Sequence, residues 1–400
     1  MNRVLIIFIL LLSSGCHVGR FIYWNYVNVN DYKKFHSITI KKSKEPFNFY
    51  VNEQPGLFNK ITYDGKFHDL DSLLRERKNK TIAFIIIRND TVLYHKYFNG
   101  FKEESIVPSF SIAKSFTSAL IGIAIAEGKI LNVDQLVSDF LPEICNKDPR
   151  FSDLTIKHLL NMRSGILFNE MAYLNPFKGI SQLYYGTNLK RQLSKSKMKS
   201  EPDKRYEYQS INSLILGLVL EKATGKSPAK YLEEKIWTRI GMKYDASWSV
   251  DSKRNKIVKA YCCINATAID YAKFGRLFLN KGNWEGKQII PEYWVDRSGT
   301  PTSPNKSYQY NWYSVRRPKY FNDSTSAIQN KQQNQRVFKS ERFPDKYYVR
   351  NYGPAYVASG LLGQFIYIEP EKNLIIIRLG KRKGKIAWFP LMGSITEILC

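Results

Sequence analysis

The sequence predicts a mixed α/β (α+β) fold: one antiparallel sheet formed from both chain ends, flanked by helices and carrying an inserted all-helical lobe. Strand-type segments occur near the start, at residues 81–87 and 92–98, and again near the end, at residues 364–370 and 373–378. Between them, from about residue 131 to 280, the spacing of apolar residues is mostly helical. Because separated strands bury their apolar faces by pairing, a single sheet built from both ends is the simplest architecture.

The first sixteen residues have the pattern of a targeting segment. A short basic start at residues 2–3 precedes an apolar run at residues 4–12, which is too short to span a bilayer. Small residues at 13–15 then lead into Cys16, as in bacterial lipoprotein signals. We therefore expect export and acylation of Cys16, which would anchor the chain to the envelope membrane on its periplasmic or surface side. Ordinary secretion with cleavage nearby is the alternative.

Residues 17–60 are aromatic and basic without a clear period, and are interpreted as a leader that packs on the domain or tethers it. The domain itself is expected to cover residues 61–400, with a first helix at 69–78. Asn89-Asp90 separates the first two strands and is a hairpin signal.

Ser111 and Lys114 stand at the start of a long apolar helix that is expected to end at Gly128. Positions three apart share one face of a helix, so the amine and the hydroxyl can meet. A partly desolvated lysine can lose its proton near neutral pH and then accept the serine proton, which activates the hydroxyl as a nucleophile. The alternative is that Ser111 merely caps the helix.

The Ser-x-x-Lys spacing also occurs at other places in this lysine-rich chain. One copy lies in a polar, basic run, one precedes a proline that suits a helix start, and one lies in a turn-rich segment. None of them opens an apolar helix, so we interpret them as chance matches. They include Ser194/Lys197, Ser227/Lys230 and Ser303/Lys306.

Later segments complete the expected architecture. Helices are predicted at residues 213–223, 266–279 and 387–399. Residues 315–350 are long, polar and poorly periodic, so a surface loop is expected there, with a lid over the crevice as one option. A site would lie in the crevice between the sheet and the helical lobe.

A second proton carrier and an oxyanion hole are needed if Ser111 is a nucleophile. Tyr208, just before an apolar helix, is the best candidate for the carrier, because a nearby lysine could depress its pKa. Tyr206 is the rival, and simple packing of both tyrosines is the alternative. The backbone N–H of Ser111, with that of Ala358 or Ser359, would form the oxyanion hole. 

The small residues near Gly360 favour close approach of a substrate to the backbone. Ser359 and Gly360 are thus candidate supporting residues. An ordinary glycine turn before a strand is the alternative.

Charge and metal-ligand spacing restrict the partners. Sixty-one Lys and Arg against 35 Asp and Glu give a formal charge of +26, which attracts anionic lipid or polymer surfaces. The lysines are scattered, which favours a generally solvated basic surface, and no nucleic-acid-binding motif is present.

No histidine has a partner at ligand spacing, so no metal or cofactor is expected, and His158 is expected on a helix surface or beside the site. The spacing of four further cysteines leaves disulfides open: Cys145, Cys262, Cys263 and Cys400.

Taken together, these motifs resemble those of the serine β-lactamase and penicillin-binding-protein superfamily, whose sites combine Ser-x-x-Lys, Tyr-x-Asn and Lys-Thr-Gly. The sequence is most similar to the class C-like branch, which includes esterases and 6-aminohexanoate-dimer hydrolases, over about residues 80–385. Five further stretches support the resemblance by their order: 154–166, 216–225, 240–242, 266–275 and 363–370.

The resemblance implies acylation of Ser111, with Lys114 and Tyr208 as proton carriers. Ser210 falls where the family has asparagine, as in the amide-dimer hydrolase and esterase branch, and is a candidate supporting residue. Residues 355–357 replace Lys-Thr-Gly and contain no cation to hold a β-lactam carboxylate.

We therefore expect an exported serine hydrolase that cleaves a small ester or amide, or a cell-wall-derived substrate, without a cofactor. A degenerate member that only binds cell-wall fragments, and a true β-lactamase or D,D-peptidase, are the alternatives. The sequence does not determine the oligomeric state.

Overall fold

A computed structural model describes residues 17–24, 26–300, 307–331, 336–340 and 344–399. Its main element is a nine-stranded sheet in the order β12-β13-β15-β16-β17-β5-β6-β2, with β14 paired to β15. The strands are β2 (Tyr50–Val51), β5 (Thr81–Arg88), β6 (Thr91–Tyr97), β12 (Tyr308–Gln309), β13 (Trp312–Phe321), β14 (Val337–Lys339), β15 (Tyr347–Gly360), β16 (Gln364–Glu369) and β17 (Leu374–Gly380).

The predicted pairing of the two chain ends is confirmed. The late strand β17 pairs antiparallel with the early strand β5, with Ile376 opposite Ile86, and β5 continues into β6 through the predicted turn. Asn89 and Asp90 both have positive φ (51° and 57°), a conformation that these residue types tolerate better than most. The short β2 departs from the antiparallel pattern and pairs parallel with β6.

Helices cover both faces of the sheet, which explains why β5 and β17 are apolar along most of their length. On one face, α10 (Ala268–Leu279) packs against β16 and β17. On the other, α3 (Leu70–Arg75) and α13 (Trp388–Ile398) enclose a second apolar cluster. Because Gly275 has no side chain, α10 can approach within reach of Ile366 and Ile375.

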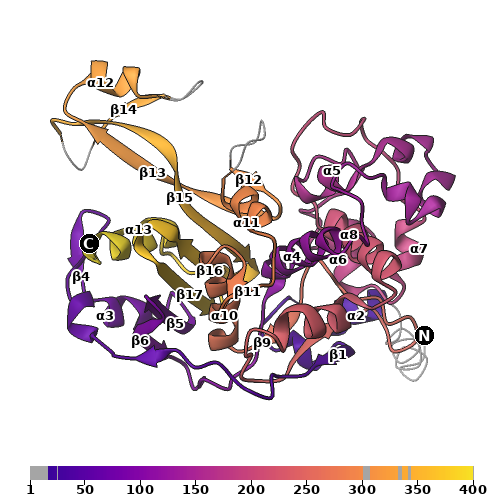
Figure 1. Cartoon of the computed structure of the whole chain (residues 1–400), viewed down its shortest axis with the longest axis horizontal. Coiled ribbons are helices and arrows are strands. Elements are labelled where there is room, and N and C mark those ends of the chain that lie inside the picture. The colour runs from indigo at the N-terminus through magenta and orange to yellow at the C-terminus, as the bar shows by residue number, and fades with distance from the viewer. Residues whose placement is uncertain (1–16, 25, 301–306, 332–335, 341–343, 400) are drawn as a thin grey trace, which may run out of the picture.

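The helical lobe lies beside the sheet, and α4 lies between the two parts (Figure 1). It consists mainly of short helices around two long apolar ones. The helices are α4 (Ala113–Ala126), α5 (Ile156–Leu160), α6 (Gly179–Tyr185), α7 (Leu189–Leu193), α8 (Ser210–Thr224) and α9 (Pro228–Leu232).

The end of the segment predicted as lobe differs from expectation. There α10 packs on the main sheet, and a small four-stranded sheet forms beside it in the order β1-β8-β9-β7. Its strands are β1 (Ser37–Ile40), β7 (Val107–Pro108), β8 (Ala246–Ser249) and β9 (Ile264–Ala266). Apolar stretches this short suit a strand or a helix equally well, so their pairing partners decided the outcome.

The leader packs on the domain and supplies β1 and β2 to its two larger sheets. The leader contains α2 (His17–Trp24), which packs on α6. No helix in the described parts of the chain is long and apolar enough to cross a membrane. The other elements are β3 (Ile61–Tyr63), β4 (Lys66–His68), β10 (Asn283–Trp284), β11 (Lys287–Gln288), α11 (Glu292–Gly299) and α12 (Ser324–Gln329).

Residues 315–350 are not the simple surface loop that was expected. β13 and β15 continue past the edge of the sheet as a long two-stranded arm that carries β14 and α12. The arm points away from the helical lobe (Figure 1). Along the arm Val315 and Val349 are buried while Tyr320 and Tyr348 are half-buried, so no regular alternation of apolar and polar residues marks these strands.

Candidate active site

Ser111 lies in a tight turn that the small sheet holds in place. The turn is the 3₁₀ helix η3 (Phe110–Ile112), which leads directly into α4. Ser109 donates its N–H to the Ile264 carbonyl (2.7 Å), and its Oγ accepts from the Ile264 N–H (3.1 Å). Phe110, between the two serines, has a φ of 46°, which is uncommon for a bulky residue. Residues in such strained conformations cluster at functional sites. Ser111 makes no capping hydrogen bond, so the interpretation as a helix cap is wrong.

Lys114 contacts Ser111 as the helical spacing predicts. Its Nζ lies 2.9 Å from Ser111 Oγ and 2.9 Å from the Tyr261 carbonyl oxygen. The side chain is 1% exposed, and this burial lowers the pKa of Lys114 to about 8. On losing a proton, the amine can still donate to Tyr261 while it turns a lone pair toward Ser111 Oγ. Lys114 is thus placed to act as a general base.

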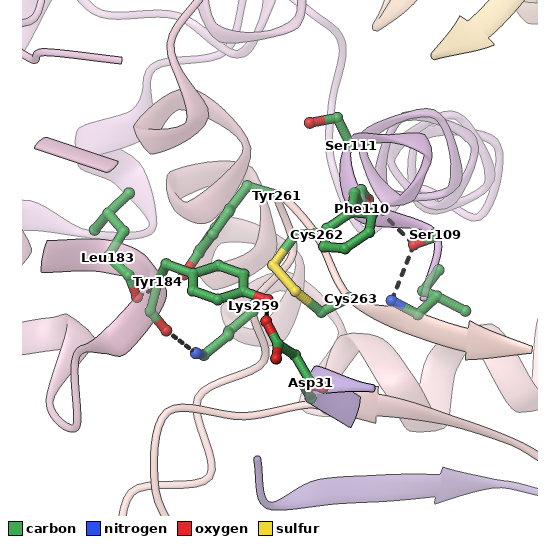
Figure 2. Close-up of a disulfide and its surroundings, with 12 residues drawn as sticks. Asp31, Ser109, Phe110, Ser111, Leu183, Tyr184, Lys259, Tyr261, Cys262 and Cys263 are labelled. Carbon is green, nitrogen blue, oxygen red and sulfur yellow. Dashed lines mark hydrogen bonds between the residues drawn. A yellow bond between two sulfur atoms is a disulfide. The ribbon is translucent and has the colours of Figure 1, made fainter. Parts of the chain in front are cut away.

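The Tyr261 carbonyl is positioned by a disulfide between adjacent residues. Cys262 and Cys263 are bonded to each other, and Cys263 has a φ of 71°. Figure 2 shows the disulfide beside Tyr261 and Phe110, immediately before the strand that holds Ser109. The indole N–H of Trp248 also donates to the Cys262 carbonyl (2.8 Å). This closed turn therefore restrains both the partner of Lys114 and the backbone next to Ser111.

Tyr208, and not Tyr206, reaches Ser111. The Tyr208 side chain hydrogen-bonds with Ser111, and its ring centroid lies 4.9 Å from Lys114 Nζ. Tyr206 instead hydrogen-bonds with Tyr313. The expected depression of the Tyr208 pKa is wrong: burial, and next the negative charge of Glu170, raise it above its usual value. Tyr208 therefore keeps its hydroxyl proton near neutral pH, whereas burial brings the pKa of Lys114 down to about 8.

Glu170 is a site residue that the sequence interpretation missed. Its carboxylate accepts two hydrogen bonds from Ser210, one from the backbone N–H and one from Oγ, both 2.7 Å. Burial raises the pKa of Glu170, whereas the Lys114 charge and the Ser210 hydrogen bonds lower it. Ser210, at the first turn of α8, thus supports a carboxylate. Glu170 stands in an irregular segment 40 positions earlier, where no local pattern marks it.

Substitution of Glu170 by glutamine is expected to move the pH dependence of acylation to lower pH. The negative charge of Glu170 raises the pKa of Lys114, so its removal leaves Lys114 neutral at a lower pH. The pH at half-maximal labelling of Ser111 by an acylating probe measures this shift. Glu201→Gln, at an exposed carboxylate, is the control and should leave the profile unchanged. An unchanged profile in Glu170→Gln would contradict the coupling.

The end of β15 approaches the turn that carries Ser111. An added Cβ at Gly360 would lie 2.3 Å from the Ser109 carbonyl oxygen and 3.3 Å from the Ser111 nitrogen. Ala358 is buried and pairs with Ile366 of β16, and Ser359 is half-buried. The structure therefore brings together the backbone segments that were expected to supply the oxyanion hole.

Gly360→Ala is expected to lower kcat while leaving the fold intact. The methyl group would collide with the Ser109 carbonyl and displace the strand end relative to Ser111, and a displacement of about 1 Å costs roughly 10²-fold in rate. Gly393→Ala is the control, because a Cβ there meets nothing within 4 Å. Steady-state kinetics and thermal unfolding of both variants make the comparison. Equal kcat in the two variants would contradict a close approach.

A cavity of about 400 Å³ opens at Ser111. Its described lining is mostly aromatic and aliphatic, and Glu170 carries its only formal charge; the lining is Phe21, Tyr26, Val27, Phe110, Ser111, Glu170, Tyr173, Leu174, Ile180, Ser181, Tyr184, Tyr185, Ser210, Tyr261, Cys262 and Leu361. In place of Lys-Thr-Gly, the strand carries Ala355, Tyr356 and Val357, and the Tyr356 hydroxyl donates to the Phe278 carbonyl. The cavity suits an apolar or uncharged group better than an anion.

The other candidates lie apart from this centre. His158 and Thr155 form a capping box at the start of α5, and Ser227 caps α9 as expected. Ser194 donates to the Arg191 carbonyl on the surface. Cys145 is free, and the described residues contain no group of three metal-ligating side chains. Cys16, Ser303, Lys306 and Cys400 lie outside the described residues.

On this mixed α/β scaffold, a buried lysine contacts a serine at the start of a central helix. These features define a serine acyl-transfer site. The beta-lactamase family model matches residues 69–387. The chain therefore belongs to the beta-lactamase family, whose members are serine hydrolases.

Individual relatives are more distant. A 6-aminohexanoate-dimer hydrolase of Paenarthrobacter ureafaciens is 24% identical over 273 residues, which cover 61% of this chain and 66% of that protein. The teichoic acid D-alanine hydrolase of Staphylococcus aureus (strain MRSA252) is 24% identical over 161 residues, 40% of this chain and 37% of that protein. These matches span less than two thirds of the curated relatives.

Solved structures show the same fold. A putative 6-aminohexanoate-dimer hydrolase from Bacillus anthracis superposes with a TM-score of 0.73 at 22% identity, covering 94% of this chain and 92% of that one. A penicillin-binding protein from Bacillus halodurans has a TM-score of 0.57 at 16% identity, covering 82% and 98%. The predicted fold class and family resemblance are confirmed.

Proposed function

We propose that this protein is an exported serine hydrolase that cleaves an ester or amide through an acyl-enzyme on Ser111. The contact between the buried Lys114 amine and Ser111 Oγ, at 2.9 Å, carries the proposal. The disulfide between Cys262 and Cys263 supports export, since disulfides persist in oxidising compartments. Acylation of Cys16 as a membrane anchor remains part of the proposal.

The reaction follows from the geometry. Neutral Lys114 accepts the Ser111 proton as Oγ attacks the substrate carbonyl carbon. The backbone N–H groups of Ser111 and Ala358 stabilise the oxyanion. Tyr208 hands a proton to the departing alcohol or amine and recovers one from Lys114. Water then attacks the acyl group, gives a proton back through the same residues, and releases the acid and free Ser111.

Labelling by a fluorophosphonate probe tests the function directly. We expect wild type to be labelled and Ser111→Ala to lose labelling completely, because the probe bonds to the activated oxygen itself. Ser194→Ala removes the serine of a chance Ser-x-x-Lys match on the surface and is the matched control. Absence of labelling in folded wild type would contradict the proposal and favour a family member that binds cell-wall fragments without turnover.

A true β-lactamase or D,D-peptidase is a less favoured function. The strand opposite Ser111 carries Ala355 through Val357 where a cation would hold the substrate carboxylate, and Glu170 lines the cavity. Hydrolysis of a chromogenic cephalosporin by wild type but not by Ser111→Ala would reverse this preference.

A further inference from the structure

Two segments distant in sequence expose large apolar side chains next to each other. One is the leader around α2, and the other is the segment between Leu167 and α6. Their exposed members include Tyr23 (84% exposed), Met171 (78%) and Leu174 (77%). We name this set the apolar rim: Ile22, Tyr23, Tyr26, Leu167, Met171, Tyr173, Leu174 and Phe177.

Ring contacts link the two segments that carry the halves of the apolar rim. The rings of His17 and Phe177 meet edge to face at 6.0 Å, and Phe21 of α2 packs on Tyr185 of α6 at 5.4 Å. Tyr26 from one half and Leu174 from the other line the cavity that contains Ser111. Part of the rim therefore lies at the mouth of the active-site cavity. Apolar patches of this extent on a soluble surface mark contact sites.

Exposed charges within the two rim segments are positive, and Lys199, at the end of the second segment, pairs with Glu207 beyond it (2.7 Å). Within residues 17–36 and 167–199, every described side chain that is both charged and exposed is a lysine or arginine. The two acidic residues of these ranges are engaged internally, Asp31 with Tyr184 and Glu170 with Ser210. The exposed cations are Lys33, Lys178, Lys190, Arg191, Lys195, Lys197 and Lys199.

The basic helix α7 is tied to the rim through one aspartate. The Arg20 guanidinium of α2 donates to the Asp251 carbonyl (3.0 Å), and the Asp251 carboxylate accepts from the Leu189 N–H at the start of α7 (3.1 Å). The cations at 190 and 191 thus lie near α2. Aromatic and aliphatic side chains surrounded by cations are the composition that binds the headgroup region of an anionic bilayer.

The position of the rim along the chain also favours a bilayer as its partner. Ile22 follows Cys16, the predicted acylation site, by six positions. An acyl chain at Cys16 would hold α2 at the bilayer surface. We propose that the apolar rim inserts into the headgroup region of an anionic phospholipid bilayer and holds the mouth of the Ser111 cavity against the membrane. This proposal goes beyond the hydrolase activity and is tested without it.

Hydrogen–deuterium exchange of the full chain on vesicles tests the rim. The chain is reconstituted into phosphatidylcholine vesicles with and without phosphatidylglycerol, so the anchor is the same in both. We expect amides in residues 17–24 and 167–178 to exchange several-fold more slowly on the vesicles that contain phosphatidylglycerol. The double variant Tyr23→Ser/Leu174→Ser should lose this protection. Leu131→Ser/Tyr293→Ser, at exposed apolar residues elsewhere, should keep it.

Other outcomes overturn the proposal. Equal exchange on both kinds of vesicle and in detergent would show that the rim does not contact anionic lipid. Protection that appears without vesicles, and increases with protein concentration, would assign the rim to contact with a second copy of the chain. Circular dichroism of the double variants confirms that lost protection is not unfolding, since the substituted side chains are exposed. Fluorophosphonate labelling is read separately, so failure here leaves the hydrolase proposal intact.

Discussion

Substitution of Lys114 by methionine is expected to slow acylation of Ser111 roughly 10²–10⁴-fold, the range that a positioned general base contributes. Methionine preserves the apolar stem of the buried side chain and removes only the amine that contacts Ser111 Oγ. Single-turnover acylation by an activated ester measures the rate. A variant within about threefold of wild type would rule out Lys114 as the base, since that is far below a general-base contribution.

The pH dependence strengthens this prediction. Burial lowers the pKa of Lys114 to about 8, and only the neutral amine accepts a proton. The wild-type acylation rate should therefore rise with pH, reach half its plateau near pH 8 and lose this dependence in Lys114→Met. Lys197→Met, in the surface Ser-x-x-Lys match, is the control and should keep both the rate and the profile.

Tyr208→Phe is expected to reduce kcat by about 10²-fold or more for substrates with poor leaving groups. The substitution removes the hydroxyl that hydrogen-bonds with Ser111 but keeps the ring between Lys114, Tyr308 and Tyr313. In the proposed mechanism the hydroxyl protonates the leaving group, so an amide or alkyl ester should lose more rate than a nitrophenyl ester, whose anion leaves without protonation.

The comparison of leaving groups separates catalysis from structure. A general distortion of the site would slow both kinds of substrate equally, and this result would contradict the assigned role. Tyr206→Phe is the matched control two residues away. It should leave kcat unchanged for both kinds of substrate, because Tyr206 hydrogen-bonds with Tyr313 instead. Acylation and deacylation rates are measured separately with a slow substrate.

The sequence was informative where local rules determine structure. The Ser111 and Lys114 spacing predicted a contact because helical geometry places positions three apart on one face. Asn89-Asp90 predicted the hairpin turn because these residues tolerate positive φ, and the strands at both ends predicted a shared sheet because apolar strands must pair. Each of these inferences depends on residues close in sequence or on a general requirement for burial.

Local rules failed where distant residues decide the environment. The pKa of Tyr208 was expected to be depressed by Lys114, yet burial and Glu170 raise it. The segment 315–350 was expected to be a loop, yet β13 and β15 pair along most of it. For Tyr208 the deciding groups come from elsewhere in the chain, whereas in 315–350 the two paired strands lie at opposite ends of the segment, separated by α12 and β14. Local periodicity indicates neither outcome.

The sequence by itself thus determined the fold class, the family and the Ser111–Lys114 pair, because helical spacing and strand burial are encoded within short segments. Only the tertiary structure decided what surrounds that pair: the Tyr261 carbonyl at the Cys262–Cys263 turn, the Glu170 carboxylate on Ser210, and the close approach of Gly360. The physical reason is that desolvation, charge coupling and close packing depend on distances between segments, which become defined when the chain folds.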